Sequence, residues 1–75
     1  MVKYLNLHGN SGIAAYEITS TTITVQFNDG MVYRYSYASA GSRNIEQMKN
    51  LAIAGAGLNS FINTHTRKLY ESKLR

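Results

Sequence analysis

The sequence predicts a single α+β domain, in which two C-terminal helices pack on one face of an antiparallel meander sheet of three strands, or of four. Two observations predict it. β-branched and aromatic residues fill three segments of the first half, separated by short turn sequences, and apolar residues recur at helical spacing from residue 42 onward. With 75 residues and no cysteine, the chain is expected to form one small domain, residues 1–75, held together by burial of its core.

Three strands are expected, over residues 13–19, 22–27 and 31–37. The loop between the last two decides which side chains share a face, because side chains alternate along a strand. A two-residue loop at Asp29-Gly30 would place Phe27 opposite Val32 and divide the apolar side chains between the faces. A three-residue loop, Asn28-Asp29-Gly30 with Gly30 left-handed, gathers them on one face and is preferred. The pairs are then Phe27 with Met31, Val25 with Tyr33, and Ile23 with Tyr35.

In the preferred register the sheet has one apolar and one polar face. With Ser20-Thr21 as a two-residue turn, the apolar face is formed by Ala14, Tyr16, Ile18, Ile23, Val25, Phe27, Met31, Tyr33, Tyr35 and Tyr37. The opposite face carries Glu17, Thr22, Thr24, Gln26, Arg34 and Ser36. We expect the helices to cover the apolar face and the polar face to meet water or a polar partner.

Helical spacing begins at Ser42, which is expected to N-cap a helix over residues 42–54 that Gly55 or Gly57 ends. Its apolar stripe is formed by Ile45, Met48, Leu51 and Ala52. A second helix is expected to start near Leu58 or Asn59, with a core-facing stripe formed by Leu58, Phe61, Ile62 and His65. Residues 1–10 alternate only weakly, which leaves an edge strand and a loose arm both open.

The net charge of +4 lies entirely in residues 38–75, because the charges of residues 1–37 cancel. Four of the six basic residues of that half lie within the last nine residues of the chain. A small excess of this kind is compatible with nucleic acid, with an acidic protein and with a small anionic ligand. No stretch resembles a signal peptide or a membrane span, so we expect a cytoplasmic protein without a membrane partner.

The residue inventory predicts no catalytic site, no metal site and no cofactor. The four carboxylates are isolated in the sequence, at Glu17, Asp29, Glu46 and Glu71, and turn or helix positions explain the last three. The two histidines, His8 and His65, lack the spacing of metal ligands, and there is no cysteine. We therefore expect a protein that is not an enzyme.

Two groups of residues favour binding instead. Tyr33 and Tyr35 offer aromatic rings, although alternate tyrosines are more typical of a half-buried sheet face. Arg34 points to the opposite face, where a solvated and a binding arginine both stay open. In the second helix Asn63, Arg67 and Lys68 extend beyond the packed stripe, whereas the place of His65 on that stripe favours a buried, hydrogen-bonded histidine over a ligand-binding one.

Two motifs in this order resemble the KTSC domain: Tyr33-Arg34-Tyr35 after the Asp29-Gly30 turn, and the later run Ser60-Phe61-Ile62-Asn63-x-His65-x-Arg67-x-x-Tyr70. This domain is named after the C-terminus of some lysyl-tRNA synthetases and also occurs as a small free-standing protein in bacteria and phages. The resemblance covers residues 11–72. It implies RNA as a ligand, with motif positions Tyr33, Tyr35, Asn63, His65, Arg67 and Tyr70. The chain departs from the family in lacking a lysine between the helices and in carrying Thr66 at a commonly aliphatic position.

We therefore expect a small non-catalytic module that binds nucleic acid, with RNA favoured, through a basic C-terminal helix and aromatic residues. The candidate binding residues are Tyr33, Arg34, Tyr35, Asn63, His65, Arg67, Lys68 and Tyr70. The alternative is a phage-type interaction or inhibitor protein that sequesters a host protein or a small nucleotide-like signal. Either protein would act in a bacterial or phage-infected bacterial cell, and a homo-oligomer stays open.

Overall fold

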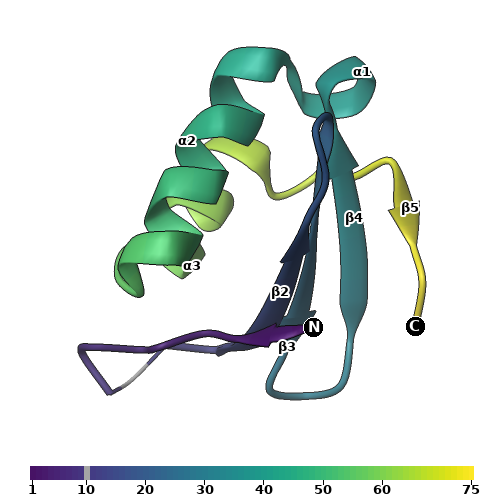
Figure 1. Ribbon diagram of the computed structural model, residues 1–75. Coiled ribbons are helices and arrows are strands. Elements are labelled where there is room, and N and C mark those ends of the chain that lie inside the picture. Colours follow the sequence, from purple (N-terminus) through teal and green to yellow (C-terminus); the bar gives the residue numbers. More distant parts are fainter. Residues whose placement is uncertain (10) are drawn as a thin grey trace.

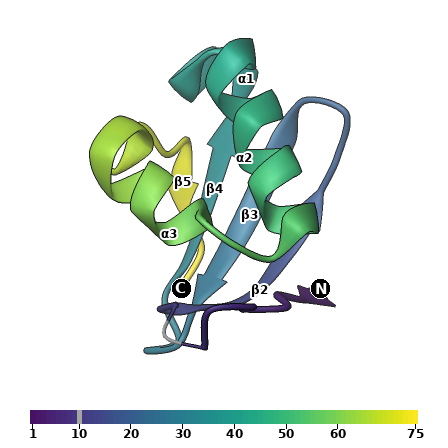
Figure 2. The ribbon, with the colours of Figure 1, turned by 90° about the vertical axis from the view of Figure 1, so that its left-hand side faces the viewer.

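A five-stranded antiparallel sheet in the order β1-β2-β3-β4-β5 forms one layer, and the helices lie on one of its faces (Figures 1 and 2). The computed structural model describes residues 1–9 and 11–75. The strands are β1 (Val2–Lys3), β2 (Ile13–Ile18), β3 (Thr22–Phe27), β4 (Val32–Ser36) and β5 (Ser72–Lys73). The helices are α1 (Tyr37–Ala40), α2 (Ser42–Ala54), α3 (Leu58–Phe61) and the π-helical η1 (Ile62–Thr66). The predicted α+β class is confirmed.

The preferred register of the β3–β4 hairpin is confirmed. Val25 pairs with Tyr33 and Ile23 with Tyr35, and the Phe27 N–H donates to the Met31 carbonyl at 2.8 Å. Gly30 has a φ of +92°, the left-handed conformation that the three-residue loop requires. The predicted apolar face therefore faces the helices. The expectation that the polar face meets water is wrong at Thr24 and Ser36, which are buried; the Ser36 side chain caps the helix that follows β4.

The prediction is wrong at one position of the apolar face. Ala14 was expected to face the core, but a bulge between Ile13 and Ala15 shifts the register, and Ile13 is buried instead. Ala14 is the extra residue of this bulge, so the alternation that holds from Tyr16 onward does not extend back to it.

The first half of the helical layer follows the predicted stripe, and Ile45, Met48 and Ala52 are fully buried. The start of α2 differs from the prediction, because Gly41 rather than Ser42 occupies the N-cap position. The short helix α1, which was not predicted, precedes it. Ser36 caps α1 through a reciprocal capping box with Ser39, and this cap ends the strand before Tyr37.

The second helix departs from the prediction at His65. Residues 62–66 form a π-helix, whose wider turn places more residues between successive core positions than an α-helix does. As a result Thr66 is fully buried, as Leu58 and Ile62 are. The prediction that His65 is buried is wrong, because its side chain is exposed. The Thr66 hydroxyl donates to the Met48 thioether sulfur at 3.6 Å, a weak acceptor.

The prediction of a basic C-terminal helix is also wrong in part. The helix ends at Thr66, and the chain then returns to the sheet as β5. β5 pairs antiparallel with β4, and the Leu74 N–H donates to the Val32 carbonyl at 2.7 Å. These bonds satisfy the outer edge of β4, which would otherwise present unpaired backbone groups.

At the opposite edge of the sheet, the N-terminal segment forms the short strand β1, which pairs with β2. Tyr4 follows β1 and is buried. The edge strand that the sequence left open is therefore present over two residues, while Asn10 of the same segment lies outside the described residues. Among the helices that the structure describes, none is long and apolar enough to cross a membrane.

We expect Gly55→Ala to destabilise the fold markedly. Gly55 ends α2 with a φ of +78°, and a Cβ there would lie 2.6 Å from the Cβ of Leu5. Backbone strain and this clash together should lower the free energy of unfolding by about 2–4 kcal/mol in a urea titration.

The matched control is Gly30→Ala, where φ is +92° but no atom lies within 4 Å of the added Cβ. This variant should lose only the backbone term, about 1–2 kcal/mol. Equal losses in the two variants would contradict the close approach of the N-terminal segment to α2.

Candidate binding site

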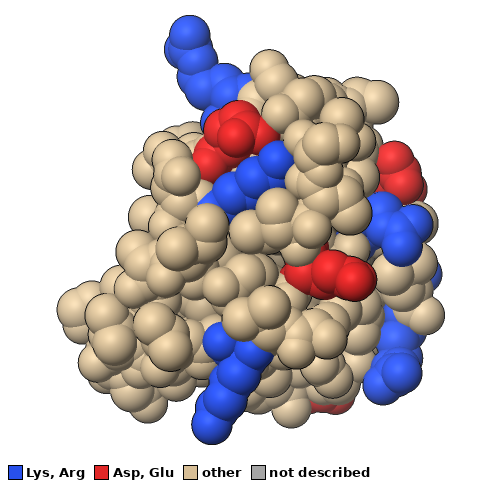
Figure 3. Space-filling view, in the orientation of Figure 1, with Lys and Arg blue, Asp and Glu red and all other residues tan. Residues whose placement is uncertain are grey.

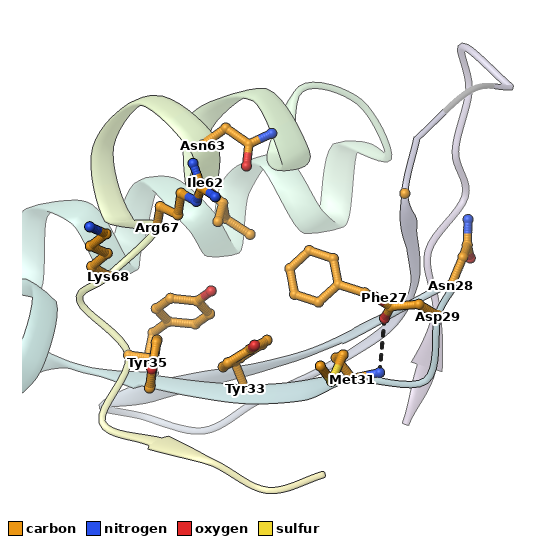
Figure 4. A pocket seen from close by; sticks show the side chains of 12 residues that line it. Phe27, Asn28, Asp29, Met31, Tyr33, Tyr35, Ile62, Asn63, Arg67 and Lys68 are labelled. Carbon is orange, nitrogen blue, oxygen red and sulfur yellow. Dashed lines mark hydrogen bonds between the residues drawn. The ribbon is translucent and has the colours of Figure 1, made fainter.

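A cavity of about 580 Å³ lies between the β3–β4 hairpin and the end of the second helix, where the helices leave part of the apolar sheet face open (Figure 4). The β3–β4 hairpin contributes its floor, which is formed by the rings of Phe27, Tyr33 and Tyr35 and by Met31 of the connecting loop. The helix end contributes Ile62, Asn63, Arg67 and Lys68, and Tyr70 comes from the segment that leads to β5. We call this space the aromatic cavity.

The rings of the cavity form a continuous cluster. The centroids of Tyr33 and Tyr70 lie 4.8 Å apart, and those of Phe27 and Tyr33 lie 5.9 Å apart with the rings nearly perpendicular. Tyr35 meets Tyr70 edge to face at 6.5 Å. These separations are typical of favourable aromatic contacts, so the cluster is a fixed surface rather than a set of independent side chains.

The tyrosines differ in how far a ligand could reach them. Tyr35 is only 1% exposed, so its ring belongs to the core and is not available for stacking. Tyr33 is half-buried, and Tyr70 is 40% exposed. Tyr33 and Tyr70 are therefore the tyrosines that can offer ring surface to a bound molecule.

Burial is the main cause that raises the pKa of the Tyr35 hydroxyl, and the neighbouring Tyr33 and Tyr70 hydroxyls act in the same direction. Together these effects raise this pKa from 10.0 to about 12. The Tyr35 hydroxyl is therefore a neutral group in the lining of the cavity throughout the physiological pH range.

The charged residues of the cavity are separated, with cations on one side and a carboxylate at the other end. Arg67 and Lys68 lie on its helix side, and Asp29 lies at the hairpin end (Figure 4). The Asp29 carboxylate accepts a hydrogen bond from the Met31 N–H at 3.0 Å and is held there. Lys73 adds a further cation near the floor, with its Nζ 6.0 Å from the Tyr33 ring centre. An anionic group would consequently be attracted to the helix side and repelled from the hairpin end.

Arg67 and Lys68 make no ion pair within the described residues, where the single salt bridge joins Lys49 to Glu46 at 2.8 Å. The Lys49 ammonium group is also bonded within the fold, because it donates to the Ser20 carbonyl at 2.9 Å. Hydrogen bonds from Lys49 and then from Tyr37 lower the pKa of the Glu46 carboxyl below its ordinary value. The cations of the cavity are thus available to a ligand, whereas Lys49 is not.

Basic side chains do not form one continuous surface on the face shown in Figure 3, where Lys and Arg are dispersed and acidic residues lie among them. A long electrostatic track on this face is therefore absent. In the aromatic cavity itself, Arg67 and Lys68 are the cations that an anion would meet.

Six of the eight predicted binding residues line this one cavity: Tyr33, Tyr35, Asn63, Arg67, Lys68 and Tyr70. Arg34 does not, because it pairs with Thr24 on the opposite face of the sheet, as its alternation with Tyr33 and Tyr35 predicts. His65 does not either. Its ring stacks on Phe61 at 4.3 Å, and its Nδ1 lies 2.8 Å from the Thr64 hydroxyl.

Sequence reasoning missed other parts of the cavity. Phe27 and Met31 were placed on the correct face but not in a site, and the alternation of the hairpin was the signal that could have added them. The position of Lys73 beside the Tyr33 ring, outside the cavity lining, was missed as well, because no pattern in the sequence predicts that this segment returns to β4. Within residues 1–9 and 11–75, no three His, Asp or Glu side chains are grouped as metal ligands.

The raised pKa of Tyr35 predicts a loss of stability at high pH. Because the folded-state pKa lies above that of the unfolded chain, the contribution of Tyr35 is complete below pH 10 and is lost as the pH rises through about 12. In a spectrophotometric titration of the phenols, one tyrosine should ionise only near pH 12, and Tyr35→Phe should remove that step.

Tyr16→Phe, which changes a buried tyrosine outside the cavity, should retain the late step. If the late step persists in Tyr35→Phe, the buried phenol of the cavity is not its source, and the assignment fails.

Comparisons with known proteins add no family to this geometry. No protein-family model matches the chain, and searches of the curated proteins and of the solved structures find no match either. The KTSC resemblance therefore stays a prediction, and the function is inferred from the cavity itself.

Proposed function

We propose that the protein is a non-catalytic module that binds single-stranded nucleic acid, with RNA favoured, by taking one nucleobase into the aromatic cavity. The observation that carries the proposal is the combination of ring surface and unpaired cations in one cavity. Its volume of about 580 Å³ lies within the range of small-molecule sites, roughly 300–1,000 Å³, and suits a single nucleotide.

The base would stack on the accessible rings of Tyr33 and Tyr70. Stacking of a base on an aromatic side chain contributes about 1–3 kcal/mol and tolerates any base, since every base has a π-face. Binding of this kind selects unpaired strands, because the bases of a duplex are already stacked on one another.

The phosphate of the same nucleotide would meet Arg67 and Lys68. Asp29 at the other end of the cavity opposes the reverse orientation, in which the phosphate would approach the hairpin. Neutralising one or two phosphates of a single strand predicts a slope of log affinity against log salt between about −0.7 and −1.4. This dependence is weaker than that of proteins with an extended basic groove.

The preference for RNA is supported by the KTSC resemblance and the synthetase context of that domain, on the motif positions Tyr33, Tyr35, Asn63, Arg67 and Tyr70. These five positions all line the cavity. His65, the remaining motif position, lies outside it, so the proposal gives His65 no contact with the ligand.

A second candidate function is the sequestration of a small nucleotide-like ligand. One observation favours it: the aromatic cavity has the size of one nucleotide, and Arg67 and Lys68 are the two basic residues in its lining. The two functions differ in how affinity depends on ligand length. A free mononucleotide would bind as tightly as an oligonucleotide only in the second case.

Charge reversal at the cavity should abolish most of the binding. We expect the variant carrying both Arg67→Glu and Lys68→Glu to bind a short fluorescent single-stranded RNA at least about tenfold more weakly at low salt, because two charge-assisted phosphate contacts are lost. The measurement is fluorescence anisotropy over a salt series.

The matched control combines Lys3→Glu with Arg43→Glu, which changes the net charge equally at exposed positions outside the cavity. This control should lose little affinity. Equal losses in the two double variants, or no saturable binding by the unaltered protein at low salt, would refute the proposed function.

A further inference from the structure

A second cavity, of about 550 Å³, lies between the N-terminal segment and the connection from α2 to α3. Its chemistry differs from that of the aromatic cavity. Its lining has no Lys, Arg, Asp or Glu. Amides, hydroxyls and an imidazole line it, contributed by Asn6, His8, Ser11, Asn59, Ser60 and Asn63. We call it the amide cavity.

Three hydrogen bonds fix the walls of the amide cavity. The Leu58 N–H donates to the Tyr4 hydroxyl at 3.4 Å, and the Leu7 N–H donates to the Gly55 carbonyl at 2.8 Å. The Asn6 side-chain carbonyl accepts from the Ser11 N–H at 3.0 Å. The N-terminal segment is thereby tied to the helical layer, so the cavity is formed before any ligand binds.

The two cavities adjoin. Asn63 lines both of them. Gly12 belongs to the wall of the aromatic cavity, and a Cβ at Gly12 would lie 3.4 Å from the Asn59 side-chain nitrogen, which belongs to the amide cavity. A ligand that fills the aromatic cavity could therefore continue past Asn63 into the amide cavity.

The chemistry of the amide cavity fits the polar parts of a nucleotide. An amide offers both a donor and an acceptor, and a hydroxyl offers either, so these groups can bond sugar hydroxyls and the edges of a base. The cavity has no Lys or Arg for a phosphate, the ring of Tyr4 is buried, and the imidazole of His8 is its one exposed ring. Sugar and base-edge recognition is the role that remains.

We propose that the amide cavity is a second nucleotide subsite, so that the protein holds two successive nucleotides of a strand. One base stacks in the aromatic cavity, and the sugar and base edge of its neighbour occupy the amide cavity, with the link between them passing Asn63. This inference rests on the proposed function, because the first subsite is the aromatic cavity.

The test compares adenosine monophosphate with 5′-phosphorylated diadenylate by isothermal titration calorimetry. The dinucleotide should bind about tenfold more tightly, since it gains the contacts of the second subsite. Asn59→Ala should remove most of this gain and leave the affinity for the mononucleotide unchanged. Asn50→Ala, an exposed asparagine of α2 outside both cavities, should change neither affinity.

Equal affinities of the unaltered protein for the two ligands would overturn the second subsite while leaving the aromatic cavity as the site of the bound nucleotide. The affinity of a longer single strand relative to the mononucleotide then decides between the two candidate functions. The second subsite is also overturned if Asn59→Ala weakens both ligands alike, or if it leaves the gain of the dinucleotide in place. If the folded protein binds neither ligand, the first subsite fails, and the second falls with it. Thermal unfolding of each variant establishes that it is folded.

Discussion

The loop between β3 and β4 sets the face on which every ring of the aromatic cavity lies. Its left-handed Gly30 and the bond from the Phe27 N–H to the Met31 carbonyl close a three-residue connection. One residue more or fewer would turn Tyr33 and Tyr35 to the opposite face, because the side-chain period of a strand is two residues. The core would then lose Tyr35, and the cavity would lose its floor. Stability and the candidate site therefore depend on the same backbone geometry.

The polar side of the site depends on how the second helix ends. The π-helical turn buries Thr66, and the chain leaves the helix at Arg67 and Lys68, beside the open part of the sheet. The return of the chain to β4 then brings Tyr70 against the Tyr33 ring. Cations and rings from distant parts of the sequence meet in this way at one cavity, and the proposed binding of a base with its phosphate uses both.

The sequence predicts those features that local periodicity determines. The register at Gly30 follows from counting alternation on both sides of a turn, and this correctly assigned Tyr33 and Arg34 to opposite faces. Periodicity could not predict that Thr66 rather than His65 is buried in the core. An apolar stripe is counted with the regular α-helical period, and η1 departs from that period. Likewise β5 is two residues long and polar, and it forms because β4 offers an unpaired edge, which is a property of the assembled sheet. The site was therefore predictable as a set of residues but not as a cavity.

The central claim is that the helix-facing side of the sheet, rather than its exposed back, receives a nucleobase. An NMR titration of isotope-labelled protein with a short single-stranded RNA tests this most directly. We predict that the ring signals of Tyr33 and Tyr70 move upfield as a base stacks on them, while signals of Arg34 and of the exposed Glu17 stay unchanged. Shifts centred on Arg34 and Glu17, with the tyrosine rings unaffected, would contradict this claim.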